Sequence, residues 1–333
     1  MREPRFWARD VDPKSREAAP LMRFLLTPLA WVYASMTARR IAKTVPQSVS
    51  AKVICVGNLT AGGVGKSPVV ATLRKRIETK YGLRVASLSR GYKGQLKGPL
   101  KVDPASHTAR EVGDEPLMLS ENGEAWIGAD RAAAGQAMAQ DGVEIILMDD
   151  GHQNPGLKKD VSLVVVDAVM GFGNGFVIPK GPLREPVLEG LSRADAIIVL
   201  GDGNPPKILQ DSGRPMMFGH VTSSTQPEQR PYVAFAGIGR PEKFFETLQT
   251  LGLEVRDAVP FPDHHTFSKA DLGYLKQLAS DRDATLVTTE KDYVRLPAEF
   301  RNKVVVLPIE VQFDQPDMLD KLIANVIKPG AHG

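Results

Sequence analysis

The sequence predicts an α/β protein whose larger sheet is mostly parallel. Short runs of Val, Ile and Leu recur along the chain without alternating polar residues, as in strands that are covered on both faces. Segments of helical composition separate these runs, and a regular alternation of strand and helix is typical of a doubly wound sheet. The chain has 333 residues, enough for about two domains of ordinary size.

The first series of elements precedes residue 203. Apolar runs predict strands at 51–58, 84–91, 143–151, 161–167 and 194–202. Helices are expected at 67–82, directly after a glycine-rich stretch, and at the alanine-rich segment 131–142. Pro, Gly, Ser and Gln are frequent across 203–231, which we interpret as a connecting region.

A second series follows this connection. Strands are expected at 231–239, 284–292 and 303–311, with a helix at 241–252. A final helix at 317–328 can pack on either domain. We therefore expect an N-terminal segment at 1–50, a larger domain at 51–226 and a smaller α/β domain at 227–333.

Basic residues are concentrated near the N-terminus. Residues 1–52 hold ten Lys and Arg against four Asp and Glu, whereas the net charge of the whole chain is only +3. The apolar stretch 21–36 is shorter than the ~20 residues of a spanning helix and contains Arg23 and Pro28. Trp31 and Tyr33, beside the basic residues that follow, favour a helix lying on an anionic membrane surface. A helix packed on its own domain, or at an oligomer contact, is the alternative.

Composition argues against several other classes of protein. No basic patch rich in aromatic residues accompanies the small net charge, so no nucleic-acid partner is expected. The first twenty residues are too charged and too acidic for a secretory signal. The single cysteine, Cys55, lies in an apolar run, which favours a reducing compartment.

The stretch "GNLTAGGVGKSP" at 57–68 lies between a predicted strand and a predicted helix, the context of a phosphate-binding P-loop. Its glycines allow main-chain N–H groups to surround phosphate oxygens, and the start of the helix adds partial positive charge. Lys66 can reach the β- and γ-phosphates of a nucleotide, and the Ser67 hydroxyl can ligate Mg²⁺. Thr60 stands where the first glycine of GxxxxGK[ST] is usual, so the loop is a variant. The predicted nucleotide-binding residues are Thr60, Ala61, Gly62, Gly63, Val64, Gly65, Lys66 and Ser67.

Two acids, Asp149 and Asp150, end the predicted strand at 143–151. A P-loop protein places the carboxylate that holds Mg²⁺ or its water shell at such a strand end. A pair of turn acids without a ligand is the alternative. No guanine-reading N-K-x-D motif is present, so the residues leave the choice of nucleotide open.

Two further clusters have the chemistry needed by an acceptor site. "GDEP" at 113–116 places Asp114 and Glu115 in a turn, where a carboxylate can orient a hydroxyl group and accept its proton. An ordinary helix cap is the alternative for Asp114. In "FPDHHTF" at 261–267, His264 can pair with a carboxylate or be an ordinary surface histidine. No further His or Cys is spaced to complete a zinc site there.

Two arginines lie in turns bounded by glycine or proline. Arg90 belongs to "SRGYKG" and Arg184 to "GPLREP". A guanidinium group suits bidentate contacts with a phosphate of ATP or of a substrate. Each arginine can equally form a structural ion pair.

In this order, the motifs GNLTAGGVGKSP, SRGYKG, GDEP, DDGHQN, GPLREP, FPDHHTF and TTEKD resemble the tetraacyldisaccharide 4'-kinase family of lipid A synthesis, from about residue 20 to 315. The chain departs from the family's usual DDG-L-Q-H motif by having His152 and Asn154, while Gln153 is retained as a candidate substrate contact. Ser67 replaces the more usual threonine and preserves the hydroxyl.

The resemblance implies an ATP- and Mg²⁺-dependent kinase, peripheral to the cytoplasmic face of the inner membrane. Its substrate would be the lipid A precursor, a tetraacylated glucosamine disaccharide 1-phosphate that is phosphorylated on the 4'-hydroxyl. Asp114 would be the general base paired with His264, Lys66 would hold the phosphates, and Glu115 and Asp150 would help to organise the metal. Two α/β/α domains would enclose the site, and no protein partner is implied.

Two alternatives of different kinds stay open at this point. One is a P-loop kinase for a soluble metabolite, which would not need the apolar N-terminus. The other is a nucleotide-controlled membrane switch, which would hydrolyse ATP without making a phosphorylated product and would leave the GDEP and FPDHHTF clusters without a role.

Overall fold

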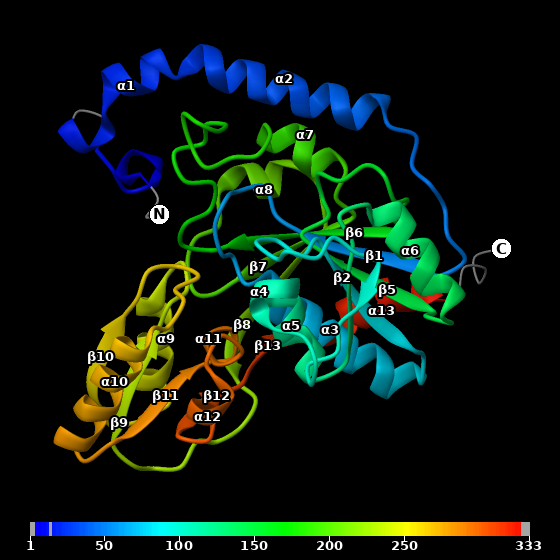
Figure 1. Cartoon of the computed structure of the whole chain (residues 1–333). Helices are drawn as coiled ribbons and strands as arrows, with labels where there is room; N and C mark the ends of the chain where they lie inside the picture. The colour runs from blue at the N-terminus through cyan, green and yellow to red at the C-terminus, as the bar shows by residue number, and fades with distance from the viewer. Residues whose placement is uncertain (1–3, 13–14, 328–333) are drawn as a thin grey trace.

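The structure is a computed structural model that describes residues 4–12 and 15–327. Figure 1 shows two α/β bodies, with a long N-terminal helix lying across the larger one. Within the described residues, the strands form a nine-stranded sheet and a four-stranded sheet. The predicted α/β class is therefore confirmed.

The larger sheet has the strand order β13-β8-β7-β6-β1-β5-β2-β4-β3. Neighbouring strands are parallel except at the two edges, where β13 pairs with β8 and β3 pairs with β4 in antiparallel fashion. The strands are β1 (Lys52–Gly57), β2 (Val85–Ser89), β3 (Leu100–Lys101), β4 (Glu124–Ile127), β5 (Ile145–Asp149), β6 (Val161–Asp167), β7 (Ala196–Leu200), β8 (Met216–Ser223) and β13 (Ile309–Phe313).

Helices cover both faces of this sheet, and successive residues of β1 show why. Ile54 and Val56 point into a core shared with α3 and α13, whereas Val53 and Cys55 point into a core shared with α6. Both faces are buried, so the strand needs an unbroken apolar run. The helices of this body are α3 (Lys66–Tyr81), α4 (Ala109–Val112), α5 (Asp114–Glu121), α6 (Arg131–Gln140), α7 (Val187–Ser192), α8 (Lys207–Asp211) and α13 (Pro316–Ile327).

The smaller sheet has the order β10-β9-β11-β12, and all of its neighbouring strands are parallel. Phe244 and Leu248 of α9 cover one face, while Leu275 of α10 and Phe300 of α12 cover the other. Its elements are β9 (Tyr232–Ala236), α9 (Pro241–Thr250), β10 (Val255–Pro260), α10 (Lys269–Asp281), β11 (Thr285–Thr289), α11 (Glu290–Tyr293), α12 (Ala298–Arg301) and β12 (Val304–Leu307).

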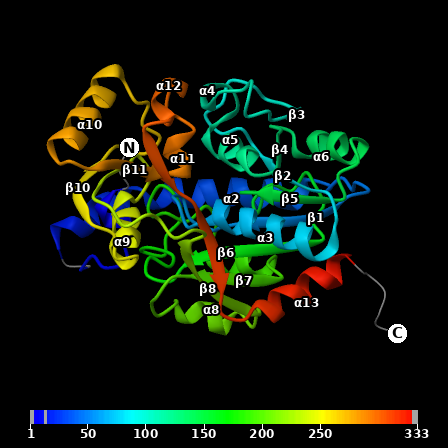
Figure 2. The ribbon, with the colours of Figure 1, turned by 90° about the horizontal axis from the view of Figure 1, so that it is seen from below.

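The chain does not pass from the larger to the smaller body only once, as the predicted domain boundary between residues 226 and 227 requires. The region 203–231, interpreted as a connection, contains α8 and the strand β8. The expected strand 303–311 is split by Pro308 into β12 and β13, and β13 returns to the larger sheet beside β8. Figure 2 shows this strand crossing from the smaller body towards α13, whose Leu319 and Ile323 pack in the larger core. The predicted smaller domain 227–333 thus contributes its last elements to the larger body, and residues 328–333 lie outside the described part.

The N-terminal segment forms two short turns, η1 (Arg5–Trp7) and η2 (Arg16–Ala18), followed by α1 (Pro20–Leu25) and α2 (Thr27–Lys43). The predicted apolar helix is therefore divided before Pro28, which occupies the first turn of α2. Lys180 ties α2 to the larger body through a hydrogen bond of 3.0 Å to the hydroxyl of Thr27.

These two helices expose an unusual number of large apolar side chains. Phe24 and Trp31 are 74% and 71% exposed. The other members of this exposed apolar face are Leu21, Met22, Leu25, Leu29, Val32 and Met36. Among the described residues, no helix combines the length and the apolar character needed to cross a membrane.

Candidate active site

A cleft of about 1870 Å³ lies between the two bodies, at the carboxyl ends of the larger sheet's central strands. This is the edge at which open α/β sheets bind their ligands. Its walls come from the loop after β1, the ends of β5 and β6, α9 and the loop before α10. Tyr33, Thr37 and Arg40 of α2 also line it, at a spacing that places them on one face of the helix.

The loop from Asn58 to Gly65 has the conformation expected of a phosphate cradle. Gly62 and Gly65 have φ angles of 103° and 89°, a left-handed region that glycine enters without strain. A Cβ atom on Gly65 would also lie 2.8 Å from Cδ1 of Leu200, so that side chain would have to move. Thr60 does not share this constraint, because it forms an isolated bridge with Leu183 in an extended conformation. This local pairing explains how the variant loop dispenses with its first glycine.

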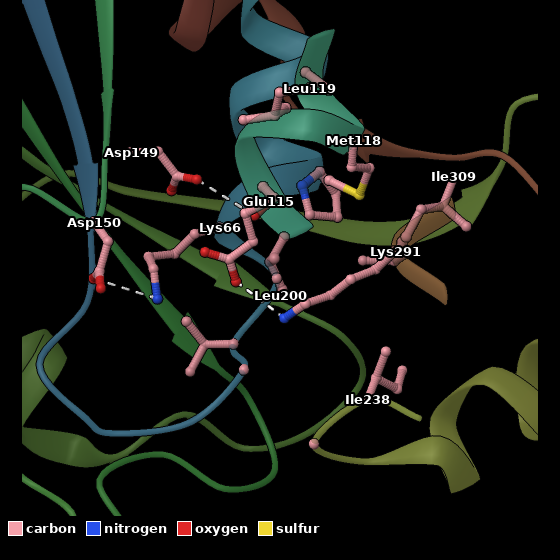
Figure 3. Close-up of a pocket in the computed structure, with 18 of the residues that line it drawn as sticks. Lys66, Glu115, Met118, Leu119, Asp149, Asp150, Leu200, Ile238, Lys291 and Ile309 are labelled. Carbon is pink, nitrogen blue, oxygen red and sulfur yellow. Dashed lines mark hydrogen bonds and ion pairs between the residues drawn. The ribbon is translucent and has the colours of Figure 1, made fainter. Parts of the chain in front are cut away.

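Lys66, the first residue of α3, reaches into the middle of the site. Its Nζ lies 3.4 Å from Oδ1 of Asp150 and 3.3 Å from the side-chain oxygen of Asn58. Figure 3 shows the lysine and Asp150 facing each other across the mouth of the loop. Arg184 donates to both carboxylate oxygens of Asp150, at 2.8 and 2.9 Å. Loss of solvation raises the pKa of Asp150, but Lys66 and Arg184 outweigh it and lower the value to about 2.

Asp149 has the opposite electrostatic environment. It is 2% exposed, and its Oδ1 is buried without a hydrogen-bond partner among the described residues. The Ser67 hydroxyl donates to Oδ2 over 3.4 Å. Burial, reinforced by the negative charge of Glu115 and opposed by Lys66, raises the pKa of Asp149 to about 7. The surroundings thus raise the pKa of Asp149 and lower that of Asp150, although the two residues are adjacent in the sequence.

Asp114 and His264 meet across the two bodies. Nδ1 of His264 lies 2.7 Å from Oδ2 of Asp114, and Nε of Arg295 lies 3.2 Å from the same oxygen. Burial raises the pKa of Asp114, but the hydrogen bond from His264 and the charge of Arg295 outweigh it, so the pKa is lowered. Asp114 begins α5 directly after Gly113, whose φ of 94° turns the chain into the helix. His264 has a φ of 59°, a left-handed conformation that is uncommon for a residue with a side chain.

Glu115 points into the cleft and forms a second contact between the bodies. Lys291 of α11 lies 3.1 Å from its carboxylate, as Figure 3 shows. Lys291 belongs to the TTEKD motif, whose sequence alone predicts no role for it. The negative charge of Glu115 raises the pKa of Asp149, although Glu115 is itself paired with Lys291.

The other predicted residues occupy different positions. Arg90 is exposed and lines the cleft. Gln153 is buried, where its amide donates to the carbonyl of Asn58 at 2.8 Å and to Glu185 at 3.0 Å. It holds the start of the phosphate loop and also lines the cleft.

Two positions that depart from the family motif have structural roles. Both ring nitrogens of buried His152 are hydrogen-bonded at 2.9 Å, one to Ser162 and the other to the carbonyl of Gly190. Asn154 accepts the N–H of Gly156 in a turn. His265, the second histidine of FPDHHTF, lies 3.0 Å from Asp271 and stacks on Phe261.

Besides Lys291 and Arg295, which contact Glu115 and Asp114, the sequence did not indicate Asp167, Arg240 and Lys243. Asp167 ends β6 and is 1% exposed, and its carboxylate forms ion pairs with Arg240 and Lys243 of the smaller body. The signal for Asp167 was present, because an acid ends its apolar strand as Asp149 ends β5. The two cations carried no such signal, since nothing local distinguishes them from solvated surface residues.

Predicted metal ligands Ser67, Glu115, Asp149 and Asp150 all line the cleft. Within the described residues, no three or more His, Cys, Asp or Glu side chains converge as a metal site. A magnesium ion bound together with a nucleotide needs only one or two carboxylates, because phosphate oxygens and water supply the other ligands.

Known proteins resemble this chain along nearly its whole length. The family model described as tetraacyldisaccharide-1-P 4'-kinase matches residues 22–328. Two relatives named tetraacyldisaccharide 4'-kinase, from Hyphomonas neptunium and Maricaulis maris, are 54% and 48% identical to the chain. The first alignment covers 98% of each chain, and the second covers 98% of this chain and 97% of the relative.

A solved structure of LpxK from Aquifex aeolicus, described as an "apo" form in complex with ATP, has the same fold. It superimposes with a TM-score of 0.71 at 24% identity and covers 92% of this chain and all of its own. The family model and the two relatives match nearly the whole chain. The protein therefore belongs to the tetraacyldisaccharide-1-P 4'-kinase family.

Proposed function

We propose that the protein transfers the γ-phosphate of ATP to the 4'-hydroxyl of a tetraacylated glucosamine disaccharide 1-phosphate, the lipid A precursor. The observation that carries this proposal is the pairing of Asp114 with His264, a residue that lines the same cleft as the phosphate loop. A kinase needs a carboxylate that can align a hydroxyl group with a γ-phosphate held in a phosphate cradle.

The phosphate loop supplies the ATP side of the site. Main-chain N–H groups of 62–67 and the start of α3 would surround the β- and γ-phosphates, with Lys66 as the positive charge. In the free protein, Asp150 and Asn58 hold Lys66 at the mouth of the loop. The lysine is therefore already positioned when the nucleotide arrives.

The chemistry of Asp149 fits a magnesium ion. A buried carboxylate oxygen without a partner, beside a serine hydroxyl, is a costly arrangement that a cation would relieve. Ser67 and Asp149 would hold Mg²⁺, with Glu115 and Asp150 close by. When bound, the ion would neutralise charge on the phosphate oxygens.

Asp114 would act on the acceptor. His264 and Arg295 both contact Oδ2, and Oδ1 makes no hydrogen bond to the residues that the structure describes. This oxygen would orient the 4'-hydroxyl and accept its proton as the bond to phosphorus forms. His264 and Arg295 would hold the carboxylate ionised and in position.

The N-terminal helices would bring the enzyme to its lipid substrate. One face of α2, with Thr37 and Arg40, lines the cleft, whereas the exposed apolar face of α1 and α2 looks outward. A helix with these two faces can rest in a membrane interface while its inner side meets the sugar headgroup. Peripheral binding to the cytoplasmic face of the inner membrane is part of the proposal, because ATP is supplied there.

Mass spectrometry tests the function directly. The full chain is incubated with ATP, Mg²⁺ and a tetraacylated disaccharide 1-phosphate in mixed micelles. We expect a product heavier by one phosphate, located on the non-reducing sugar, and none without ATP. ATP hydrolysis with no phosphorylated lipid would contradict the proposal and favour the switch ATPase.

A further inference from the structure

Asp167 of the larger body forms ion pairs with two cations of the smaller body. Asp167 lies at the carboxyl end of β6, beside the strand that carries the phosphate loop. Its Oδ1 accepts the main-chain N–H groups of Val169 and Met170, and its Oδ2 contacts both Arg240 and Lys243. One carboxylate therefore holds two cations, although one would neutralise it.

The two cations differ in what else they touch. Arg240 precedes α9 and also donates to the carbonyl oxygen of Gly63 over 3.3 Å. Gly63 is one of the paired glycines of the phosphate loop, three residues before Lys66. Lys243 is more exposed than Arg240, with 48% against 30% of the side chain accessible.

The surroundings of Asp167 favour its charged form. Burial raises the pKa of Asp167, but hydrogen bonds from Lys243, the Met170 amide and Arg240 outweigh it and lower the value to about 2. Asp167 therefore stays ionised, and Lys243 alone is sufficient to balance it. Arg240 is the surplus charge, and it already lies against the loop that binds phosphate.

We propose that Arg240 is an arginine finger supplied by the smaller body: it leaves Asp167 to Lys243 and donates to the γ-phosphate of the bound nucleotide during transfer. A planar guanidinium group presents a rigid fork of N–H donors that matches two phosphate oxygens, whereas the ammonium group of a lysine acts as a point charge. An arginine in this position stabilises the charge that spreads over the γ-phosphate oxygens in the transition state.

The step is balanced within the proposed kinase reaction, on which this inference rests. The bond between the γ-phosphorus and the bridging oxygen breaks and leaves ADP. The acceptor oxygen forms the new bond to phosphorus, and its proton passes to Asp114. Arg240 neither gains nor loses a proton, since it acts only as a hydrogen-bond donor and a positive charge.

Glutamine variants of the two cations form a matched pair. Arg240→Gln and Lys243→Gln each remove one positive charge from the same carboxylate, but only Arg240 touches the phosphate loop. We expect Arg240→Gln to lower kcat by about 10²-fold or more, with KM for ATP changed less than about fivefold. Asp167→Asn, which releases Arg240 from its ion pair, should cost less than about tenfold in kcat. Lys243→Gln leaves Asp167 to Arg240 alone, so its loss in kcat should fall between those of the other two variants. Thermal melting confirms that each variant is folded.

The variant Arg240→Lys separates a catalytic role of Arg240 from a purely structural one. Arg240→Lys keeps the positive charge and the ion pair, so it would restore full activity if the arginine only joined the two bodies. As a finger it should stay at least about tenfold below wild type in kcat, because the lysine lacks the fork.

Both lipid phosphorylation and the slow hydrolysis of ATP by water are measured, since a finger assists transfer to either acceptor. Absence of lipid product from the wild type would refute the proposed function, while the hydrolysis ratio would still test Arg240. Equal losses in the three glutamine and asparagine variants, or a loss confined to KM, would overturn the finger.

Discussion

Nδ1 of His264 lies 2.7 Å from Oδ2 of Asp114, although the two residues are 150 positions apart in the sequence. Asp114 belongs to the larger body and His264 to the smaller one. Their contact depends on how the two bodies meet, so any relative movement of the bodies changes the environment of the carboxylate. Closure of the two bodies over a ligand would therefore act directly on the candidate catalytic group.

Replacing Asp114 tests the proposed base. Asp114→Asn keeps the shape and a hydrogen bond to His264 but cannot accept a proton. We expect kcat to fall by a factor on the order of 10²–10⁴, the usual range for a positioned base, with ATP affinity within a few-fold of wild type. Initial rates and calorimetric titration with ATP measure the two quantities. Wild-type turnover would remove the assignment.

A double-mutant cycle tests whether Asp114 and His264 act as a unit. His264→Ala should be milder than Asp114→Asn, since Arg295 still contacts the carboxylate. In the double variant the two losses in kcat should overlap, because a partner has nothing left to position. Losses that simply multiply would show that the two residues act independently.

Lys66→Ala is expected to weaken ATP binding and to lower kcat together, because the lysine holds the phosphates in both the ground state and the transition state. The matched control is Lys52→Ala. Lys52 begins β1, at the opposite end of that strand from the phosphate loop, and pairs with Asp160 at 3.1 Å. Activity of Lys66→Ala close to that of the control would mean that the loop does not bind the triphosphate.

Asp149→Asn should stabilise the free protein at alkaline pH. The folded-state pKa of about 7 exceeds the ordinary value, so the folded state binds a proton that the unfolded state releases. Stability is therefore lost as the pH rises from about 4 towards 7, and Asn removes this loss. We expect a gain on the order of 2–4 kcal/mol at pH 8 that disappears near pH 4. Thermal or urea unfolding at the two pH values measures it.

The adjacent acid is the control of opposite sign. Asp150 has a folded-state pKa of about 2, below its ordinary value, so its stabilising contribution is present at neutral pH and is lost only as the pH falls through about 4 to 2. Asp150→Asn should therefore destabilise the free protein at pH 8. A shift of the same sign in both variants would contradict the electrostatic assignment of the site.

Acidic substitutions on the N-terminal helices test the membrane surface. Phe24→Asp and Trp31→Asp place charge on the most exposed apolar positions of α1 and α2. Binding to vesicles of anionic phospholipid should fall by at least about tenfold, as measured by co-sedimentation. Tyr274→Asp, at a comparably exposed position on α10 in the smaller body, should bind as the wild type does. Equal binding by all variants would rule out this face.

Local patterns predicted the parts of the site that lie next to one another in the chain. The phosphate loop follows from glycines between an apolar strand and a helix, and Asp149 and Asp150 follow from acids at a strand end. Both signals are carried by a few consecutive residues whose conformation is set by backbone sterics and by burial of the strand. The strands β1, β5, β6 and β7 were found for the same reason, within two residues at each end.

Residues that meet from distant segments were beyond such patterns. The motif FPDHHTF indicated a histidine able to pair with a carboxylate, and its partner came from the family resemblance. Neither the motifs nor the composition indicated that Arg240 and Lys243 would both contact Asp167. The return of β13 to the larger sheet was also missed, because an apolar run does not record which sheet it will join.

The order of apolar and glycine-rich segments was thus enough to specify a parallel sheet with a nucleotide loop, since hydrophobic burial and backbone freedom act over a few residues. Which side chains face one another across the cleft, and which of two neighbouring carboxylates has a raised pKa, depended on the packing of the folded chain. Coulombic and desolvation energies follow distances in space, and the folded chain creates those distances.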